Sequence, residues 1–475
     1  MMFFCGLIDC EVNNMKKHDV MELYIEEIRF PNIGLAYVDG VEVEVKGGLP
    51  GQRLLVRLVK KGKINKAQIM RVLTPAPQEI TSDCSVFGIC GGCSFQNIPY
   101  EYELQLKTKM VKDILLDVEG IAKQTLNDIN SFGSPTERYR NKMEYSFGDD
   151  GNINGELTLG MRKKGSYYEA LDSSCCLLCH PDFGKISTAT LEYFKNTNET
   201  FYHRKKETGT LRHLAIRHGA NVGEIIVNLV TAGDKDYSNY AKMLLDISLE
   251  NTIVGIINTT TNSVADAIIP DEVKVLHGRD YYHEHFTEHG MGMTYKVPLF
   301  GFFQTNYIMV EKLYAIIAEF CGDLNNKTVF DLYCGSGTIG LYLARYVARS
   351  SQNIKKIVGI EIVEEAIQSA KQNAALNGDN AEFIAGDVKK IVREITENPD
   401  IIILDPPREG IVPKAIPHIL AFGAKKIVYI SCKPTSLAAN LPAFIEGGYT
   451  VAKIQCVDMF ARTANIETIV LLEKS

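Results

Sequence analysis

The sequence has no apolar run long enough to cross a membrane. A membrane-spanning helix needs roughly 20 mostly apolar residues, and no segment of the 475-residue chain approaches that length. Residues 1–10 are apolar but short, with neither a basic region before them nor a small-residue cleavage site after them. We therefore expect no membrane partner, no signal peptide and a cytoplasmic protein. We expect residues 1–10 to be a disordered extension, because the structured pattern begins near Met21.

Acidic residues are absent from residues 46–71. The net charge of the whole chain is −7, which argues against a protein that coats nucleic acid indiscriminately. The absence of negatively charged side chains over this long stretch is compatible with a solvated surface and with a face that binds a polyanion. The basic residues of the stretch are Lys46, Arg53, Arg57, Lys60, Lys61, Lys63, Lys66 and Arg71.

An even spacing of cysteines, as in a disulfide framework, is also lacking. The 12 cysteines fall into clusters, and no secretory signal accompanies them. This pattern favours a cytosolic protein that uses some thiols as ligands or nucleophiles. The composition, with 45% hydrophobic and 23% charged residues, is that of a globular protein, and the length predicts two to four domains.

The pattern along the chain predicts three regions. Residues 18–76 read as a small β-barrel, with strands at 41–45, 53–59 and 67–73. Residues 77–300 read as an α+β domain, with a helix at 100–116 and hairpin strands at 211–217 and 224–230.

Residues 301–475 alternate strands and helices. The expected strands are 328–332, 356–360, 401–404 and 426–430, with helices at 338–349 and 364–376 between them and a final strand at 468–472. This alternation predicts βαβ units, a mainly parallel sheet, and ligands bound beyond the carboxyl ends of its strands.

A glycine-rich loop follows the first of these strands. Gly335, Gly337 and Gly340 satisfy G-x-G-x-x-G, and the acidic Glu361 ends the next strand. Such a loop lets a ligand approach the backbone, while the acid can bind ribose hydroxyls. Asp331 precedes the glycines, where its charge would oppose a pyrophosphate but suit a sulfonium cofactor. The loop therefore favours S-adenosylmethionine, with NAD binding and a simple tight turn as alternatives.

Two further strands end in residues suited to catalysis. Asp405-Pro406-Pro407-Arg408 follows one of them, and Ser431-Cys432-Lys433-Pro434 follows the next. Cys432 is therefore expected at the ligand-binding edge of the sheet, where the adjacent Lys433 could stabilise a thiolate nucleophile. The alternative is an inert buried thiol. The carboxylate of Glu467 comes just before the last strand.

A separate group of cysteines has metal-ligand spacing. Cys84, Cys90 and Cys93 form C-x5-C-x2-C with glycines between them, and Cys175, Cys176 and Cys179 lie downstream. Both zinc and an iron–sulfur cluster accept four thiolates. The spacing leaves the choice between these two metals, and the identity of the fourth ligand, open.

Together these motifs resemble those of the RNA uracil-5-methyltransferase family, in particular its iron–sulfur branch acting on 23S ribosomal RNA. The resemblance runs from about residue 22 to the end and includes the cysteine motif, Tyr139-Arg140-Asn141-Lys142, residues 302–306, residues 331–338 and the two strand exits. It implies a multidomain α/β protein with an N-terminal OB-like TRAM barrel, a central iron–sulfur domain and a C-terminal Rossmann-like class I methyltransferase domain. It also implies that a helix near residues 100–124 packs on the catalytic domain.

The resemblance assigns roles residue by residue. Cys432 would be the nucleophile and Glu467 the proton acceptor, with Phe302 and Asn306 near the target base. The [4Fe-4S] cluster would be held by Cys84, Cys90, Cys93 and, because of its spacing from Asp172, Cys176. Cofactor contacts would come from Gln304, Tyr333, Gly335, Gly337, Thr338, Glu361 and Asp405.

The resemblance predicts a monomer that transfers a methyl group from S-adenosylmethionine to C5 of a uracil in large-subunit ribosomal RNA. Transfer RNA as substrate is the nearest alternative. A non-enzymatic RNA-binding iron–sulfur protein, an NAD-dependent oxidoreductase and an adenine amino-methyltransferase are alternatives from other classes. The non-enzymatic protein would leave the cofactor loop unexplained, and the oxidoreductase would leave Cys432 unexplained. The adenine amino-methyltransferase would not account for the arginine that follows the two prolines.

Overall fold

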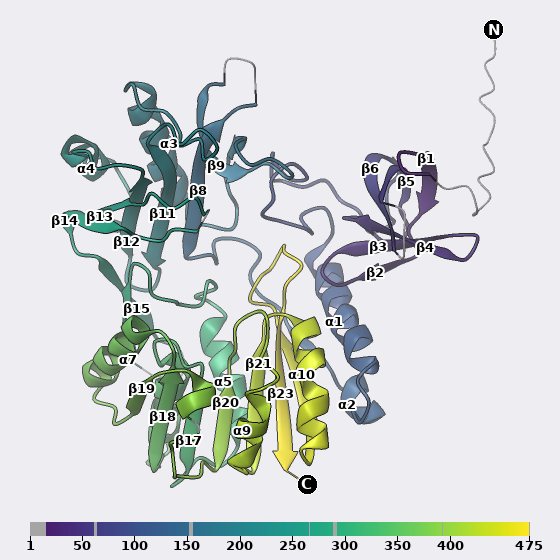
Figure 1. Ribbon diagram of the computed structural model, residues 1–475, viewed down its shortest axis with the longest axis vertical. Helices are drawn as coiled ribbons and strands as arrows, with labels where there is room; N and C mark the ends of the chain where they lie inside the picture. Colours follow the sequence, from purple (N-terminus) through teal and green to yellow (C-terminus); the bar gives the residue numbers. More distant parts are fainter. Residues whose placement is uncertain are drawn as a thin grey trace. The chain divides into compact units, whose positions relative to one another are not determined.

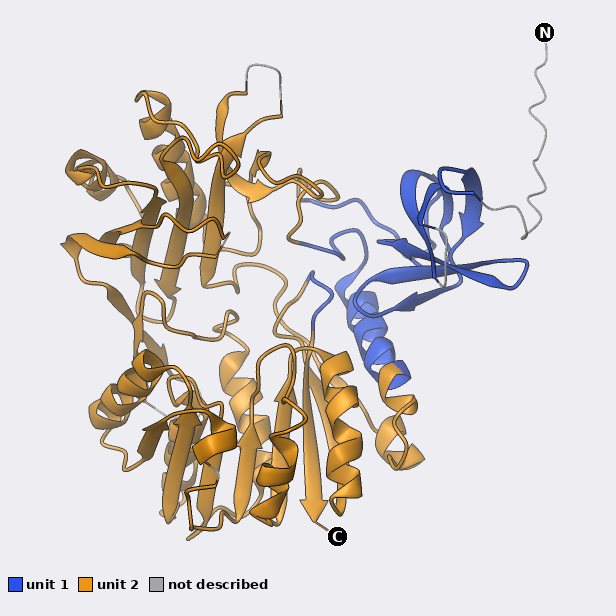
Figure 2. Cartoon of the chain, viewed as in Figure 1, with its two compact units in different colours: residues 1–83, 93–113, 462–465 blue, residues 84–92, 114–461, 466–475 orange. Residues whose placement is uncertain are grey.

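The computed structural model of the protein describes residues 16–60, 64–151, 155–265, 267–287, 292–391 and 393–474. The chain divides into two compact units (Figure 2). Unit 1 comprises residues 1–83, 93–113 and 462–465, and unit 2 comprises residues 84–92, 114–461 and 466–475. The expected N-terminal extension and Lys61 and Lys63 of the basic stretch lie outside the described residues. Within the described ranges, no helix has the length and apolar content needed to span a bilayer.

Unit 1 is built around a six-stranded sheet of order β1-β5-β6-β4-β3-β2. Because β1 pairs with β5 and also contacts β3, the sheet curls back on itself, as expected of a small barrel. Alternate residues such as Leu54, Val56 and Leu58 point into its core. The strands are β1 Val20–Tyr24, β2 Glu27–Arg29, β3 Ile33–Val38, β4 Val41–Lys46, β5 Arg53–Lys60 and β6 Asn65–Thr74.

A second apolar cluster of unit 1 joins the barrel to a helix. Helix α1 spans Tyr100–Leu116, as predicted, and its Leu106 and Met110 pack with Ile28 of the barrel and with Ala464. The first part of the expected packing helix thus belongs to unit 1. The following segment lies on the catalytic domain within unit 2: α2 (Lys123–Asn127) contacts β22 (Tyr449–Val457), and a Cβ on Gly120 would meet Ile445.

Unit 1 also contains a buried ionic network. The side chains of Glu103 and Lys107 are both fully buried, with 2.8 Å between Lys107 Nζ and Glu103 Oε1. The backbone amide of Arg462 donates to the same carboxylate at 2.7 Å, and its guanidinium donates to the Ile98 carbonyl at 2.9 Å. The network therefore fixes the 462–465 loop within unit 1.

Removal of the Arg462 charge should destabilise the protein. Arg462→Met keeps most of the side-chain volume but weakens the pairing of a buried carboxylate, at an expected cost of about 3 kcal/mol in unfolding free energy. Arg29→Met is a matched control, because Arg29 pairs with Glu42 at 3.0 Å on the surface and its loss should cost less than about 1 kcal/mol. Denaturant unfolding of both variants measures the difference. Equal, small losses would show that the network contributes little.

Unit 2 begins with a seven-stranded, mainly antiparallel sheet of order β10-β9-β8-β11-β12-β13-β14. Only β12 and β13 pair in parallel, and α4 lies between them in the chain. The elements are β8 Lys142–Asp149, β9 Leu157–Arg162, β10 Ala170–Asp172, α3 Pro181–Lys195, β11 Leu211–Gly219, β12 Glu224–Thr231, α4 Ser238–Leu245, β13 Thr252–Thr260 and β14 Glu272–Gly278, followed by the hairpin β15 Tyr281–Phe286 and β16 Met293–Pro298.

The rest of unit 2 is an eight-stranded sheet of order β19-β18-β17-β20-β21-β23-β22-β7, covered by helices (Figure 1). Strands β17 to β21 run parallel and β23 is antiparallel to β21. The elements are β7 Ser131–Phe132, α5 Val310–Cys321, β17 Thr328–Leu332, α6 Thr338–Ala348, β18 Lys356–Glu361, α7 Glu364–Asn377, β19 Glu382–Ala385, α8 Val388–Ile391, β20 Ile401–Leu404, α9 Ile416–Ala421, β21 Lys426–Ser431, α10 Pro434–Glu446, β22 and β23 Glu467–Lys474.

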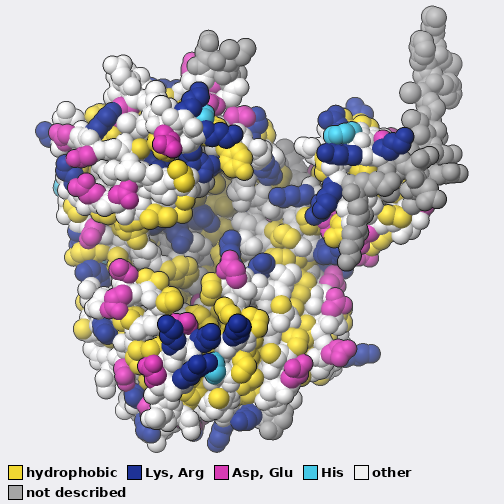
Figure 3. Space-filling model, in the orientation of Figure 1, with side chains coloured by type: hydrophobic (Ala, Val, Ile, Leu, Met, Phe, Trp, Pro, Cys, Tyr) yellow, Lys and Arg dark blue, Asp and Glu magenta, His cyan; other side chains and the backbone are white. Residues whose placement is uncertain are grey.

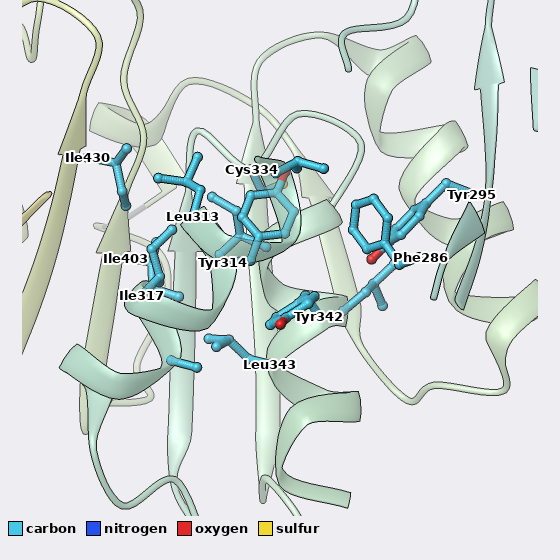
Figure 4. Packing of buried hydrophobic residues seen from close by; sticks show 14 of the residues in the cluster. Phe286, Tyr295, Leu313, Tyr314, Ile317, Cys334, Tyr342, Leu343, Ile403 and Ile430 are labelled. Atoms are coloured by element: carbon cyan, nitrogen blue, oxygen red, sulfur yellow. The ribbon is translucent and has the colours of Figure 1, made fainter. Parts of the chain in front are cut away.

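The main apolar core of unit 2 lies under this sheet. Phe286 and Tyr295 of the β15–β16 hairpin pack with Tyr314 of α5 and Tyr342 of α6 (Figure 4). Residues before 301 thus contribute to the core of the C-terminal domain.

The strands and helices predicted for residues 301–475 are confirmed, with ends that differ by at most two residues.

Candidate functional site

The glycine-rich loop joins β17 to α6, as the sequence predicts. Tyr333, Gly335 and Gly337 all have positive φ angles, of 66°, 52° and 74°. A non-glycine residue rarely adopts this conformation, so Tyr333 marks a constrained turn of the kind found at functional sites. A Cβ on Gly335 would meet open space, whereas one on Gly340 would lie 3.1 Å from Ile357. Gly335 thus leaves room for a ligand, and Gly340 allows the helix to approach the sheet.

Two carboxylates shape this loop. Asp331 is fully buried, and its Oδ2 accepts a hydrogen bond from the Gly340 amide at 3.0 Å, while Oδ1 has no hydrogen-bond partner in the described part of the chain. Burial raises the pKa of Asp331 to about 7. Glu361 accepts hydrogen bonds from the amides of Gly335, at 3.3 Å, and Val363, at 3.0 Å. Asp331 and Glu361 thus both accept hydrogen bonds from backbone amides of the loop and the start of α6. Their carboxylate oxygens suit a ligand that carries hydroxyl or amino groups.

Thr338 and Gln304 lie close to the same loop. The Thr338 hydroxyl is 2.8 Å from the Tyr314 hydroxyl, and the Thr338 carbonyl accepts a hydrogen bond from Tyr295. Gln304 is 6% exposed, and its carbonyl accepts a hydrogen bond from Asn141. Thr338 therefore anchors the start of α6 to the core, and its contact with a cofactor remains a prediction.

Cys432 and Glu467 come together at the carboxyl edge of the sheet. Strand β21 pairs with β23 so that Ser431 lies opposite Thr468, and the next residues at this end, Cys432 and Glu467, are close enough to interact electrostatically. The Glu467 side chain is buried, and its Oε2 has no hydrogen-bond partner among the residues that the structure describes. An unpaired buried carboxylate is costly, and burial together with Asp405 raises its pKa well above the usual range. Glu467 is thus a strong proton acceptor once ionised.

The environment of Cys432 differs from the expectation that Lys433 stabilises a thiolate. Burial, and after it the negative charge of Glu467, raises the pKa of Cys432 to about 11. The cation that opposes this rise is Arg408, which lies within hydrogen-bonding reach of the thiol, and not Lys433, which is exposed. The structure does not bear out the expectation about Lys433, because its side chain is exposed just before α10 begins, whereas Arg408 is the cation that lowers the pKa of the thiol. Burial likewise raises the pKa of the half-buried Asp405, to about 7.

The two residues expected near the base occupy different environments. Phe302 is 57% exposed, and the Lys142 ammonium lies 5.1 Å from the centre of its ring. Asn306 is fully buried; its Nδ2 donates to Ser134 at 2.8 Å and its Oδ1 accepts from the Met309 amide at 3.0 Å. Phe302 is open to a ligand, while the Asn306 amide stabilises the approach to α5.

The cysteines of the predicted cluster belong to both units, with Cys84, Cys90 and Cys176 in unit 2 and Cys93 in unit 1. In unit 2, Cys84 and Cys90 both lie within electrostatic reach of Cys176, and the Gly92 amide donates to Cys90 Sγ at 3.3 Å. In unit 1, Gln96 donates to Cys93 Sγ at 3.7 Å. The thiols of Cys84, Cys90 and Cys176 in unit 2 are thus close enough to interact electrostatically. Across the described residues, however, no group of three or more His, Cys, Asp or Glu side chains has the arrangement of a metal site.

Arg408 and Lys142 lie within the sequence motifs, but neither was predicted to have a role in the site. Arg408 is the cation nearest the proposed nucleophile, and Lys142 covers the ring of Phe302. These two contacts join residues that are far apart in the sequence. No local sequence pattern could therefore have indicated them.

The fold is similar to that of a solved methyltransferase. The Pyrococcus abyssi tRNA (uracil-54, C5)-methyltransferase, in complex with S-adenosyl-L-homocysteine, matches with a TM-score of 0.70 at 24% identity over 95% of this chain and 100% of that chain. At this identity the likeness shows the fold: a multidomain α/β protein with a β-rich N-terminal region and a C-terminal methyltransferase domain.

Sequence comparisons define the family. The family model for tRNA (uracil-5-)-methyltransferase matches residues 264–475. An uncharacterized RNA methyltransferase of Caldanaerobacter subterraneus subsp. tengcongensis is 42% identical over 97% of this chain and 100% of its own length. One from Clostridium tetani is 41% identical over 97% of this chain and 99% of its own length. The chain belongs to the RNA uracil-5-methyltransferase family, whose members use S-adenosylmethionine.

Proposed function

We propose that the protein methylates C5 of a uracil in 23S ribosomal RNA through a covalent bond between Cys432 and C6 of the base. The observation that carries this proposal is the pairing of β21 with β23, which brings the Cys432 thiol within electrostatic reach of Glu467, a buried carboxylate whose Oε2 lacks a hydrogen-bond partner among the described residues. The glycine loop that would hold the methyl donor follows β17, in the same sheet.

The residues of the site meet each chemical need of the reaction. Uracil C5 is a poor nucleophile, so the Cys432 thiolate adds to C6 and forms an enolate with raised electron density at C5. S-adenosylmethionine, when bound, supplies the methyl group that C5 attacks. Glu467 then removes the C5 proton, and the electrons of the broken C–H bond restore the C5–C6 double bond as the thiolate leaves.

The cofactor and base would be held by different parts of the site. Glu361 and Asp405 supply acceptors for hydroxyl and amino groups of the cofactor, and the open space at Gly335 admits it. Phe302 offers an exposed ring on which a flipped uracil can stack. The remaining proposed contacts are Gln304, Tyr333, Gly337 and Thr338 for the cofactor and Asn306 for the base.

The barrel of unit 1 would bind RNA through its basic stretch. All six described basic residues of residues 46–71 are exposed, and one of them, Lys66, pairs with Glu44 at 3.0 Å. A one-sided field of this kind supplies sequence-independent affinity for phosphates. The exposed basic residues are Lys46, Arg53, Arg57, Lys60, Lys66 and Arg71.

Transfer RNA is the second candidate substrate. The family model and the solved structure of similar fold both bear names of enzymes that act on tRNA. Mapping of 5-methyluridine in ribosomal and transfer RNA from a strain that lacks the gene separates the two. Loss of the modification from 23S ribosomal RNA alone supports the proposal, and loss from tRNA alone contradicts it.

We further propose that Cys84, Cys90, Cys93 and Cys176 hold a [4Fe-4S] cluster. Anaerobically purified protein should then be brown and contain about four irons per chain. Cys84→Ala or Cys90→Ala should abolish the colour. Cys175→Ser should not, because Cys175 is exposed and hydrogen-bonds Ser85 at 3.6 Å. Stoichiometric zinc without iron in protein kept free of air would overturn the assignment.

A further inference from the structure

Two loops of the central sheet in unit 2 each carry a run of three basic residues. One loop, residues 162–169, joins β9 to β10 and begins Arg162-Lys163-Lys164. The other, residues 201–209, precedes β11 and contains Arg204-Lys205-Lys206. The two loops together hold six basic residues and only two acidic ones, Glu169 and Glu207.

Aromatic contacts hold the two loops together. The ring of Tyr168 stacks on that of His203, with 4.3 Å between centroids and 20° between planes, and also lies near Phe201. The Arg204 guanidinium lies 5.6 Å from the centre of the Tyr167 ring. Tight turns close each loop, through Ser166 N to Lys163 O and Lys206 N to His203 O. The basic runs are therefore adjacent in space although 40 residues separate them in sequence.

The side chains at the tips of these loops are exposed. Tyr167 is 72% exposed, and Lys164, Lys205 and Lys206 of the same two loops are also exposed. Lysine and arginine side chains gather with a histidine on the upper part of unit 2 in Figure 3. We call Lys164, Tyr167, Arg204, Lys205 and Lys206 the basic–aromatic surface.

We propose that the basic–aromatic surface binds single-stranded RNA that flanks the methylated uridine. This inference rests on the proposed RNA substrate and adds a binding site outside the barrel and the catalytic domain. Exposed lysines around an aromatic ring match the two components of single-strand recognition, phosphate neutralisation and base stacking. The Arg204 guanidinium lies over the Tyr167 ring, and the large exposed area of Tyr167 leaves room for one unstacked base to lie against it.

The exposed Tyr167 ring favours single-stranded RNA as the ligand over a nucleic-acid duplex or an acidic protein. A duplex keeps its bases stacked internally and offers no free base to Tyr167. An acidic peptide would be attracted by the lysines but would gain little from an exposed ring. The surface also borders the cysteine loop, since Lys163 forms a β-bridge with Cys90 and the Lys164 amide donates to the Ile89 carbonyl.

The charge component is tested with a triple variant of the full-length protein, Lys164→Glu, Lys205→Glu and Lys206→Glu. The matched control reverses three exposed lysines elsewhere in unit 2, at Lys195, Lys355 and Lys371, for the same change in net charge. The probe is a fluorescent single-stranded RNA of roughly 30 nucleotides, longer than one binding site. We expect at least about a tenfold rise in Kd and a salt slope smaller by about 2, since each phosphate contact contributes about 0.7.

The stacking component is tested with Tyr167→Ala and Tyr167→Phe. Alanine should weaken binding of the single strand about tenfold, and phenylalanine should restore it, because the ring and not the hydroxyl stacks. Binding of a duplex of the same length should change much less. In methylation assays on a 23S RNA transcript, KM should rise while kcat stays at the wild-type value, since none of these residues belongs to the catalytic site.

Three outcomes overturn the inference: an unchanged Kd in the triple variant, an equal loss in the control variant, or poly-glutamate that displaces the RNA and binds more tightly than it does. Failure of the proposed function looks different. A wild-type protein that methylates no RNA, yet loses single-strand binding only in the surface variants, would contradict the function and support the surface.

Discussion

Replacement of Cys432 by alanine is expected to abolish methylation and to prevent any covalent bond to RNA. Loss of a covalent nucleophile costs roughly 10⁴-fold or more in turnover, and no described thiol other than Cys432 follows β21 at the edge shared with Glu467. Methyl transfer from labelled S-adenosylmethionine and a denaturing gel of protein with 5-fluorouracil RNA measure the two losses. Fluorine at C5 cannot leave as a proton would, so wild-type protein remains attached to this RNA.

The matched control for this variant is Cys175→Ala, which removes another thiol that is exposed and lies outside the catalytic domain. It should retain turnover and crosslinking. Binding of S-adenosylmethionine, followed through the rise in melting temperature that a ligand causes, should be normal in both variants. A Cys432→Ala protein that still methylates or still crosslinks would show that the nucleophile is elsewhere.

The rate of adduct formation should also rise with pH. Because the pKa of Cys432 is raised to about 11, the reactive thiolate is scarce at neutral pH in the RNA-free protein. Its fraction increases about tenfold per pH unit below that pKa. Rapid-quench crosslinking between about pH 7 and 9 should follow this increase. A rate that is constant over the range would mean that RNA binding itself lowers the pKa of the thiol.

Replacement of Glu467 by glutamine should stop the reaction after the Cys432 adduct has formed and the methyl group has transferred. Cys432 can still add to C6 and the methyl group can still transfer, but the C5 proton has no acceptor. The enzyme is therefore expected to remain attached to methylated RNA and to migrate slowly on a denaturing gel, with turnover reduced by about 10² to 10⁴-fold, the usual contribution of a general base. Natural uracil RNA suffices for this experiment.

The two variants distinguish a catalytic base from a structural carboxylate. Removal of a group that only supports the fold would lower adduct formation and turnover together. Removal of the base should increase the adduct while turnover falls. A Glu467→Gln protein that turns over at the wild-type rate would leave the role of Cys432 intact and assign the base to another group, for which Asp405 is the nearest carboxylate.

Much of the catalytic domain was predictable because its signals are local. Short apolar-rich runs with a glycine or proline shortly after them, such as residues 328–332 and 401–404, coincide with β17 and β20. The rule that ligands bind beyond the carboxyl ends of parallel strands then placed the glycine loop and Cys432 at one edge. The register of the antiparallel β23 could not be read from sequence, yet by setting Thr468 opposite Ser431 it brings Glu467 to the end of β21 that leads into Cys432.

The parts that escaped prediction depend on contacts distant in sequence. The raised pKa of Cys432 results from burial and from Glu467, which lies 35 residues away, and the buried amide of Asn306 is satisfied by Ser134. The motif that contains Asn306 indicates a functional position but not which of its atoms are already hydrogen-bonded. The 462–465 loop belongs to unit 1, where the Arg462 amide donates a hydrogen bond to Glu103. No local sequence pattern predicts this contact.

Mass spectrometry of the covalent complex tests the central claim most directly. Wild-type protein is incubated with methyl-labelled S-adenosylmethionine and 5-fluorouracil-substituted 23S ribosomal RNA, then digested with protease and nuclease. We predict one crosslinked peptide, with the nucleotide attached at Cys432 and the labelled methyl group on the pyrimidine ring. A labelled methyl group on adenine, or a crosslink at a residue other than Cys432, would contradict the account.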